Sequence, residues 1–276
     1  MKQLKKIDTD ALWQREQGWN SQKKSGRKYD DAEELRFWEK LAPHYSEKFN
    51  LYRDVPYLGE WIHENVGDNR RIIDMGCGSG NFTIPMASYS QEILAIDFSP
   101  AMLSVLQGEL TARQISNVKT CCSKWEDFHE TYEADYVLAV NSMYRMCYMG
   151  SALKKITAYG RKGFIIIRTL LKPMLYSLYD DLELNYRRNN DYMLMPMMLW
   201  DMGIHAEVSF WHYDRLMHYE DLKAAQKEMT ADLGELSYMS YEGELKSRFL
   251  EKARRDGAGF TWRSERIVEV VSWFKK

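Results

Sequence analysis

Short apolar runs recur through the middle of the chain and are separated by stretches with helical spacing. The runs cover residues 71–73, 93–96, 117–122, 134–140 and 162–168. Runs of this length, bounded by polar or glycine-rich turns, are typical of buried strands. The stretches between several of them, including 81–87, 100–110 and 153–159, favour helices. Alternating strands and helices predict an α/β domain built on a parallel sheet.

The pattern changes after residue 170. Segments 206–217 and 259–274 alternate β-branched or aromatic residues with polar ones, which predicts two further strands. The residues between them are too many for a hairpin turn and carry helical patterns at 220–233 and 242–256. A helical insertion therefore separates these two strands. Near the start of the chain, Leu35, Trp38 and Leu41 have helical spacing before Pro43.

A glycine-rich turn follows the first predicted strand. That strand ends at Asp74, the turn contains Gly76, Gly78 and Gly80, and the second strand ends at Asp97. Glycines let a backbone approach a ligand closely because no Cβ stands in the way. Strand, glycine turn, helix, strand and acid together predict the nucleotide-binding half of a doubly wound α/β domain.

The charge near the turn indicates which nucleotide is held. The spacing is G-x-G-x-G, and Asp74 lies two residues before the first glycine. A carboxylate there would repel the pyrophosphate of a nicotinamide dinucleotide. It would attract the ammonium and sulfonium of S-adenosylmethionine, by about 4 kcal/mol for charges ~4 Å apart at an effective dielectric of about 20. Asp97 is placed to accept hydrogen bonds from ribose hydroxyls.

With these residues the chain resembles the class I S-adenosylmethionine-dependent methyltransferases, whose first motif is acid-x-G-x-G-x-G. The resemblance implies an α/β fold with a doubly wound, mostly parallel seven-stranded sheet, an antiparallel last strand, and helical N-terminal and cap insertions. Its regions would be an N-terminal arm and lead-in helix (1–50), the cofactor-binding core (51–170), helical insertions around strand six (171–258) and the final strand (259–276).

The resemblance also implies which residues contact the cofactor. The pattern Trp38-x-x-x-Ala42-x-x-Tyr45 is similar to the family's lead-in helix, and packing in the core is the alternative role for Tyr45 and Met102. The loop after the third strand, 123–127, lacks the family's usual adenine-binding acid, so Ser123 or the backbone near Lys124 would replace it. The implied cofactor residues are Tyr45, Asp74, Gly76, Cys77, Gly78, Gly80, Asp97, Phe98, Met102, Lys124, Trp125 and Asn141.

Candidate substrate residues follow the fourth strand, because ligands bind where strands of an open α/β sheet end. Tyr144 and Arg145 lie there, and covering the sheet edge is their alternative role. His205 is a candidate base, although single histidines are commonly structural. The segment after Asn141 lacks the prolines of an N-P-P-Y motif, which argues against nucleobase or glutamine amino groups as acceptors.

Composition and charge indicate which partners and which cellular compartment to expect. The 276 residues carry a net charge of −2, which argues against a dedicated nucleic-acid binder. The four cysteines form no C-x-x-C pair, so we expect reduced thiols, no metal site and a cytoplasmic protein. No leader or membrane-spanning run is apparent. Residues 1–28 hold eight Lys or Arg against three acids, and Trp13 and Trp19 lie among them. They predict either a solvated arm or a cover for the active site.

The function that we predict is methyl transfer to a small-molecule acceptor in a capped pocket. A methionine-rich insertion, about 172–205, would serve as core, substrate wall or the face of a homodimer. An RNA or protein acceptor is the alternative within the same chemistry, suggested by the basic arm. A cofactor-binding subunit without catalysis is the alternative from another class.

Overall fold

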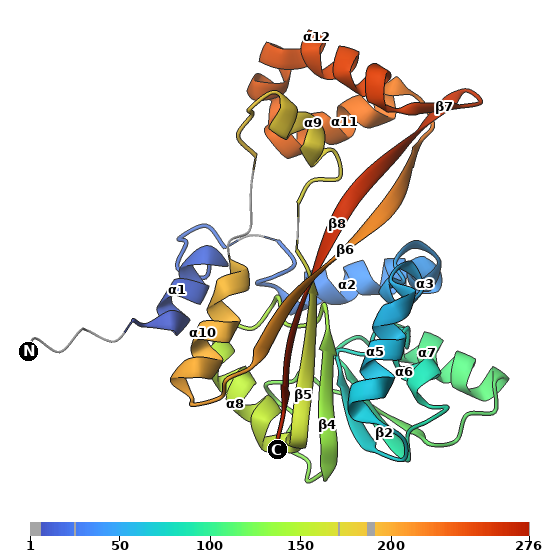
Figure 1. Ribbon diagram of the computed structural model, residues 1–276, viewed down its shortest axis with the longest axis vertical. Helices are drawn as coiled ribbons and strands as arrows, with labels where there is room; N and C mark the ends of the chain where they lie inside the picture. The colour runs from blue at the N-terminus through green and yellow to red at the C-terminus, as the bar shows by residue number, and fades with distance from the viewer. Residues whose placement is uncertain (1–6, 25, 171, 187–190, 276) are drawn as a thin grey trace, which may run out of the picture. The chain divides into compact units, whose positions relative to one another are not determined.

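The computed structural model describes residues 7–24, 26–170, 172–186 and 191–275. Within them, eight strands form one sheet in the order β3-β2-β1-β4-β5-β8-β6, with β7 paired to β8 (Figure 1). The pairs β1–β2, β1–β4, β2–β3 and β4–β5 are parallel. The strands are β1 (Arg71–Met75), β2 (Glu92–Asp97), β3 (Val118–Cys122), β4 (Ala134–Val140), β5 (Gly160–Thr169), β6 (Glu207–Tyr219), β7 (Arg254–Asp256) and β8 (Gly259–Phe274).

The predicted fold class is confirmed: the sheet is mostly parallel, its C-terminal strands are antiparallel, and helical insertions are present. The strands expected at 206–217 and 259–274 are β6 and β8, which are neighbours in the sheet although α11 (Leu222–Leu233) and α12 (Glu235–Lys252) separate them along the chain. The expected number of seven strands is one too few. The additional strand, β7, has three exposed residues and no apolar run that would reveal it.

Each central strand buries both faces, because side chains alternate between the two sides of the sheet. Ile73 and Leu94 belong to a large apolar cluster that includes residues of α8 (Met149–Tyr159) and α10 (Leu194–Asp201). Ala95 points to the other side and packs with Leu103 and Leu106 of α7 (Pro100–Ala112). Figure 1 shows α1 (Thr9–Glu16), α8 and α10 on one side of these strands and α5 (Pro56–Val66), α6 (Thr83–Met86) and α7 on the other. The core is therefore a three-layer α/β structure.

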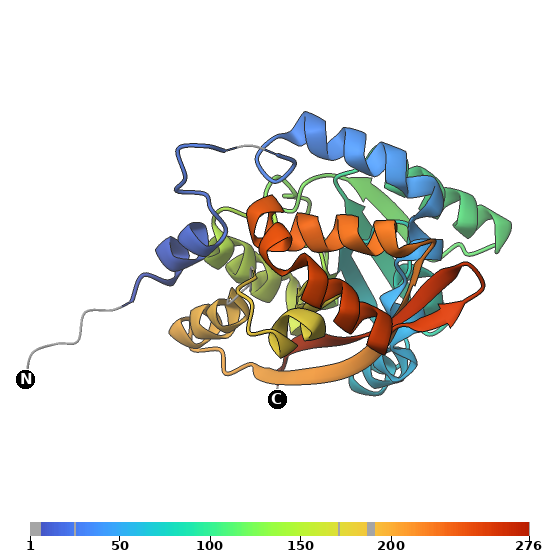
Figure 2. The same ribbon diagram turned by 90° about the horizontal axis from the view of Figure 1, so that it is seen from above.

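Side chains cap the N-termini of α2 (Asp31–Leu41) and α7. Asp30 caps α2 by accepting a hydrogen bond from the backbone N–H of Glu33, and Ser99 caps α7 in the same way through Met102. Figure 2 shows α2 in blue beside α7 in green, two helices that are in contact. The described part of the chain also contains the helices η1 (Ala42–His44), α3 (Tyr45–Lys48), α4 (Leu51–Asp54), α9 (Tyr176–Asp181) and η2 (Asp191–Met193).

The described part of the N-terminal segment, which starts at residue 7, is anchored to the core. Trp13, on α1, is 1% exposed and packs in the large apolar cluster. Its indole Nε1 donates a hydrogen bond to the Met146 carbonyl oxygen at 2.7 Å. Asp10 accepts a hydrogen bond at 2.8 Å from the backbone N–H of Gly150, in the first turn of α8. A carboxylate at a helix N-terminus also interacts favourably with the helix dipole.

The chain divides into two compact units. The first comprises 1–168, 191–210 and 269–276, and the second comprises 169–190 and 211–268. The second unit has its own apolar cluster, in which Tyr179, Met229, Leu245 and Phe249 are fully buried. The region expected to hold the helical insertions, 171–258, contributes to both units, because α10 packs with α8 and α1 in the first unit.

Two expectations from composition bear on the fold. Cys77, Cys121, Cys122 and Cys147 are all free thiols. Within the described part of the chain, none of the helices combines the length and the apolar character needed to cross a membrane.

Replacing Trp13 tests how firmly the N-terminal segment is anchored. We expect Trp13→Ala to lower the free energy of unfolding by about 3–5 kcal/mol, because it removes a large buried side chain and leaves a cavity. Trp13→Phe retains most of the apolar volume and loses the hydrogen bond to Met146, so about 1 kcal/mol is expected. Urea unfolding measures both. A loss below about 1 kcal/mol for the alanine variant would show that α1 is not part of the cooperative core.

Candidate functional site

A cavity of about 660 Å³ opens at the carboxyl ends of β1, β2, β3 and β4. This is the edge at which open α/β sheets bind their ligands. Its floor comes from the segments that follow these four strands, and its remaining wall comes from the N-terminal segment, including Trp19, Tyr29 and Trp38. All residues that line it belong to the first unit.

The glycine turn after β1 adopts backbone conformations that larger residues avoid. Gly76 has φ +70°, and a Cβ at this position would lie 2.2 Å from the Cβ of Ser142. Gly80 has φ +88°, and its Cβ would lie 2.4 Å from Leu106 Cδ1. Gly78, by contrast, is uncrowded: a Cβ at this position would make an ordinary van der Waals contact with Tyr45 Cε1, at 3.9 Å. The turn thus packs against protein at two glycines and leaves the backbone of the middle one open to the cavity.

Asp97 connects the turn to the end of β2. Its carboxylate accepts hydrogen bonds from the backbone N–H groups of Gly78 and Ser99, both at 2.8 Å. Burial raises the pKa of Asp97, and these two hydrogen bonds oppose that rise by stabilising the charged form. The side chain lines the cavity, at the place expected for a ribose-binding acid.

Asp74 lies in a different environment from the one we predicted. It is 2% exposed and is not among the residues that line the cavity. Its Oδ2 accepts a hydrogen bond from the Thr83 hydroxyl at 2.5 Å, so it links β1 to α6. Burial raises the pKa of this carboxyl to about 7. In this geometry the Asp74 carboxyl is bonded to α6 and stands outside the cavity wall.

Some of the other predicted cofactor residues line the cavity, and the rest lie behind the glycine turn. Cys77 packs in the apolar cluster with α7, and Gly80 lies against Leu106, so both stand behind the turn. Asn141 ends β4 with φ +51°, a conformation uncommon for a residue with a side chain. The predicted residues that line the cavity are Tyr45, Gly76, Gly78, Asp97, Phe98, Met102, Lys124, Trp125 and Asn141.

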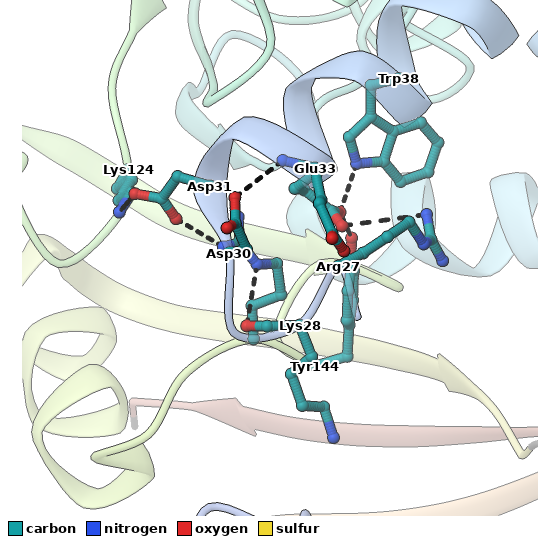
Figure 3. Close-up of polar contacts among 10 residues, drawn as sticks. Arg27, Lys28, Asp30, Asp31, Glu33, Trp38, Lys124 and Tyr144 are labelled. Atoms are coloured by element: carbon teal, nitrogen blue, oxygen red, sulfur yellow. Dashed lines mark hydrogen bonds and ion pairs between the residues drawn. The ribbon is translucent and has the colours of Figure 1, made fainter. Parts of the chain in front are cut away.

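The N-terminal turn of α2 is held over the cavity by an ionic latch. Asp31 forms ion pairs with Lys124, in the loop after β3, and with Arg145, in the loop after β4. Figure 3 shows the Asp31 carboxylate turned towards Lys124. Burial acts to raise the pKa of Asp31, but the hydrogen bonds from Lys124 and Arg145 hold it below its usual value. Arg145 also donates a hydrogen bond to the Lys28 carbonyl oxygen at 3.3 Å.

The three candidate substrate residues have different surroundings. The Tyr144 hydroxyl lines the cavity and donates a hydrogen bond to Glu34. Arg145 serves the latch, and its guanidinium lies over the ring of Phe98, 5.3 Å from the centroid. His205 is exposed, packs against Trp200 at 4.8 Å between ring centroids, and does not line the cavity. The structure therefore brings the first two to the cavity and not the third.

Several cavity residues escaped prediction from the sequence. Glu34 is fully buried, and Tyr29 and Ser142 also contribute to the wall. One signal was available for Glu34: it stands four residues before Trp38, so both occupy one face of the same helix. An acid on the apolar face of an amphipathic helix indicates a buried polar role.

The cavity suits S-adenosylmethionine. It has an acid at the end of β2, an apolar patch from Phe98 and Met102, and an accessible glycine backbone at Gly78. Its volume falls within the range of about 300–1,000 Å³ that is common for small-molecule sites. These features would hold the ribose, the adenine and the amino-acid end, respectively.

Comparison with known families decides the assignment. The profile of the family described as "Methyltransferase domain" matches residues 67–227, more than half of the chain. The chain belongs to this family. It is an S-adenosylmethionine-dependent methyltransferase of the Rossmann-like class, as its glycine turn and paired acids indicated.

Relatives of this methyltransferase match it in part. A protein of Haemophilus influenzae with no described function is 25% identical over 185 residues, which cover 65% of this chain and 68% of that protein. A tRNA/tmRNA (uracil-C(5))-methyltransferase of Neisseria meningitidis serogroup B is 34% identical over 69 residues. That match covers 25% of this chain and only 18% of the tRNA enzyme.

Solved structures with the same fold have low sequence identity to the methyltransferase. The [4+2]-cyclase SpnF aligns with a TM-score of 0.54 and 11% identity, covering 88% of this chain and 96% of SpnF. A proposed methyltransferase of Bacillus halodurans C-125 aligns with a TM-score of 0.52 and 13% identity, covering 78% and 97%. These likenesses concern the fold, which by itself does not determine the reaction.

The pKa of Asp74 gives a test of its buried position. A carboxyl whose pKa rises to about 7 in the folded state binds more protons there than in the unfolded chain, where its pKa is about 3.9. Its burial therefore costs stability as pH rises from about 4 to about 7. We expect the stability advantage of Asp74→Asn over the natural protein to grow by about 2–3 kcal/mol between about pH 5 and about pH 8. Urea unfolding at both pH values measures it, and a pH-independent difference would contradict the assigned environment.

The latch gives a second test. Asp31→Asn removes the charge shared by Lys124 and Arg145, and exposed ion pairs contribute about 0.2–1 kcal/mol each. We expect cofactor affinity to fall about two- to tenfold at low salt, with the difference shrinking near 1 M salt, where charges are screened. Calorimetric titration measures this. Glu33→Gln is the matched control, since Glu33 is an exposed acid two residues away that lies outside the cavity wall. A loss that is independent of salt, or equal in the control, would contradict the latch.

Proposed function

We propose that this methyltransferase acts on a small polar molecule enclosed with the cofactor beneath the N-terminal segment. The observation that carries the proposal is the latched cover: α2 and the segment before it contribute residues from Trp19 to Trp38 to the cavity wall. A polymer would need an open groove leading to the reacting atoms. A small acceptor needs only room beside the cofactor.

The size of the cavity supports this proposal. About 660 Å³ must accommodate both the cofactor and the acceptor. Since small-molecule sites commonly occupy about 300–1,000 Å³, the space that remains beside the cofactor suits a molecule of metabolite size.

The chemistry of the wall favours an acceptor with polar atoms. Among the described residues, Trp19 Nε1 and Ser142 Oγ are buried without a hydrogen-bond partner, and both residues line the cavity. A buried donor without a partner costs about 1–3 kcal/mol, so a ligand that supplies an acceptor atom there recovers that cost. The rings of Trp19, Tyr29 and Trp38 offer flat apolar surface beside these groups.

The reaction places modest demands on the side chains. The cofactor supplies an activated methyl group with a good leaving group, so alignment of the acceptor atom provides much of the acceleration. Burial and the hydrogen bond to Glu34 raise the pKa of Tyr144 far above neutrality, so its phenol stays protonated and acts as a hydrogen-bond donor. An acceptor with an available lone pair, such as a neutral amine, a thiol or an aromatic nitrogen, therefore suits this site.

RNA is the second candidate acceptor. The partial match to a tRNA/tmRNA methyltransferase favours it, although that match covers a quarter of this chain. In the structure, the basic residue Lys28 bonds to Gln17 and Arg27 lies over the ring of Phe37. These contacts direct two cations of the arm towards the protein itself.

Transfer of labelled methyl groups distinguishes the candidates. The full chain is incubated with methyl-labelled S-adenosylmethionine and, separately, with total RNA, total protein or a metabolite extract below about 1 kDa from one bacterial lysate. We expect label in the metabolite fraction, because the cover limits acceptor size. The Asp97→Ala variant is the control, since it loses the acid that holds the turn and should transfer nothing. Label in RNA or protein instead would overturn the proposal.

A further inference from the structure

Glu34 presents a buried carboxylate to the cavity with one oxygen unused. It lies in the first turns of α2, is 0% exposed and lines the cavity. Its Oε1 accepts hydrogen bonds from the Trp38 indole N–H, at 2.5 Å, and from the Tyr144 hydroxyl. Its Oε2 is buried and has no hydrogen-bond partner in the described part of the chain.

The nearest cation pairs with Glu34 only loosely. Arg27 Nη1 lies 3.9 Å from Oε2, beyond hydrogen-bond distance, and its side chain is 41% exposed. Figure 3 shows Arg27 and Trp38 approaching the same carboxylate. The Arg27 guanidinium lies over the ring of Phe37, 3.4 Å from the centroid. Arg27 Nη1 is itself buried and has no hydrogen-bond partner in the described part of the chain, so the two groups form an ion pair without a hydrogen bond. The carboxylate therefore lacks a close positive charge.

A second acid faces the same space. Asp97 lines the cavity from the β2 side, and repulsion from Glu34 adds to burial in raising the pKa of Asp97. Two buried carboxylates that line the same cavity are costly unless a cation comes between or beside them. Among all the residues of the cavity wall, five are acids and three are bases, which gives a net charge of −2: Asp30, Asp31, Glu34, Asp97 and Glu126 against Lys28, Lys124 and Arg145.

The two basic residues in the loops after β3 and β4 already form ion pairs. Lys124 and Arg145 pair with Asp31. Their positive charge is therefore directed to the latch rather than to Glu34. Asp74, the acid that the sequence suggested for the cofactor's positive charge, lies outside the cavity wall and is bonded to Thr83.

We propose that Glu34 is the carboxylate that faces the positively charged end of bound S-adenosylmethionine, in the role that the sequence assigned to Asp74. The cofactor carries two cationic groups, the sulfonium and the ammonium, and Glu34 Oε2 stabilises one of them. The assignment concerns cofactor binding, so it holds whichever acceptor is methylated. It also gives the N-terminal segment a part in cofactor binding, because α2 supplies this carboxylate.

Three ligands that differ in their positive charges distinguish a contact to the sulfonium from a contact to the ammonium. S-adenosylmethionine carries both cationic groups, S-adenosylhomocysteine keeps only the ammonium, and 5′-methylthioadenosine has neither. We expect Glu34→Gln to weaken binding of S-adenosylmethionine by about tenfold or more relative to 5′-methylthioadenosine, measured by calorimetric titration of the full chain. Glutamine retains the volume and an oxygen that accepts from Trp38 and Tyr144, so the cavity keeps its shape. If S-adenosylhomocysteine weakens in parallel with S-adenosylmethionine, Glu34 faces the ammonium; if it follows 5′-methylthioadenosine, Glu34 faces the sulfonium.

Two variants complete the design. Glu33→Gln removes the same charge from the neighbouring, exposed position and should leave all three affinities unchanged. Glu34→Asp keeps the charge and should still bind S-adenosylmethionine in preference to 5′-methylthioadenosine. This variant tests the proposal even if the glutamine variant folds poorly. A parallel change for all three ligands in Glu34→Gln, or no change at all, would overturn the proposal. Because no methyl transfer is measured, this outcome is independent of whether the acceptor is a small molecule.

Discussion

The carboxylate of Asp97 holds the site together. By accepting one backbone N–H from the glycine turn and another from the start of α7, it joins three segments at the edge of the sheet: the end of β2, the turn after β1 and the N-terminus of a helix. A charged acceptor with two backbone donors is among the stronger hydrogen-bonding arrangements in proteins. This arrangement leaves a buried carboxylate in the cavity wall, and the two backbone N–H groups offset part of the cost of its burial.

The cover over the cavity follows from the same electrostatics. The N-terminal turn of α2 is rich in acids, yet it approaches an edge of the sheet that already has one. Lys124 and Arg145 make the approach possible by pairing with Asp31, and the rest of the segment is fastened farther away, where Trp13 enters the core and Asp10 caps α8. Different parts of the N-terminal segment therefore have different roles. Trp13 of α1 anchors the segment in the core, whereas α2 supplies side chains to the cavity wall.

The sequence predicted the central sheet well because its strands are buried on both faces and read as short apolar runs. It also located the turn, since three alternating glycines directly after a buried strand are typical of a backbone that must approach a ligand. It did not reveal the surroundings of Asp74, because spacing along a strand does not show which side a carboxylate takes. The Asp74 carboxyl bonds to Thr83 of α6, whereas its neighbour Met75 packs in the opposite layer and lines the cavity. The helix α1 and the importance of Glu34 were missed because their partners, Met146 and Tyr144, lie more than 100 residues away along the chain. Such contacts leave no local pattern.

The division of the chain has a consequence for how such an enzyme can diversify. Every residue of the cavity wall falls between Trp19 and Cys147, whereas residues 211–268 form a unit with its own buried aromatic and aliphatic core. Recognition of an unchanging cofactor is therefore encoded in one half of the polypeptide. The other half can accumulate substitutions, or exchange its helices, under a separate selection that leaves cofactor recognition intact.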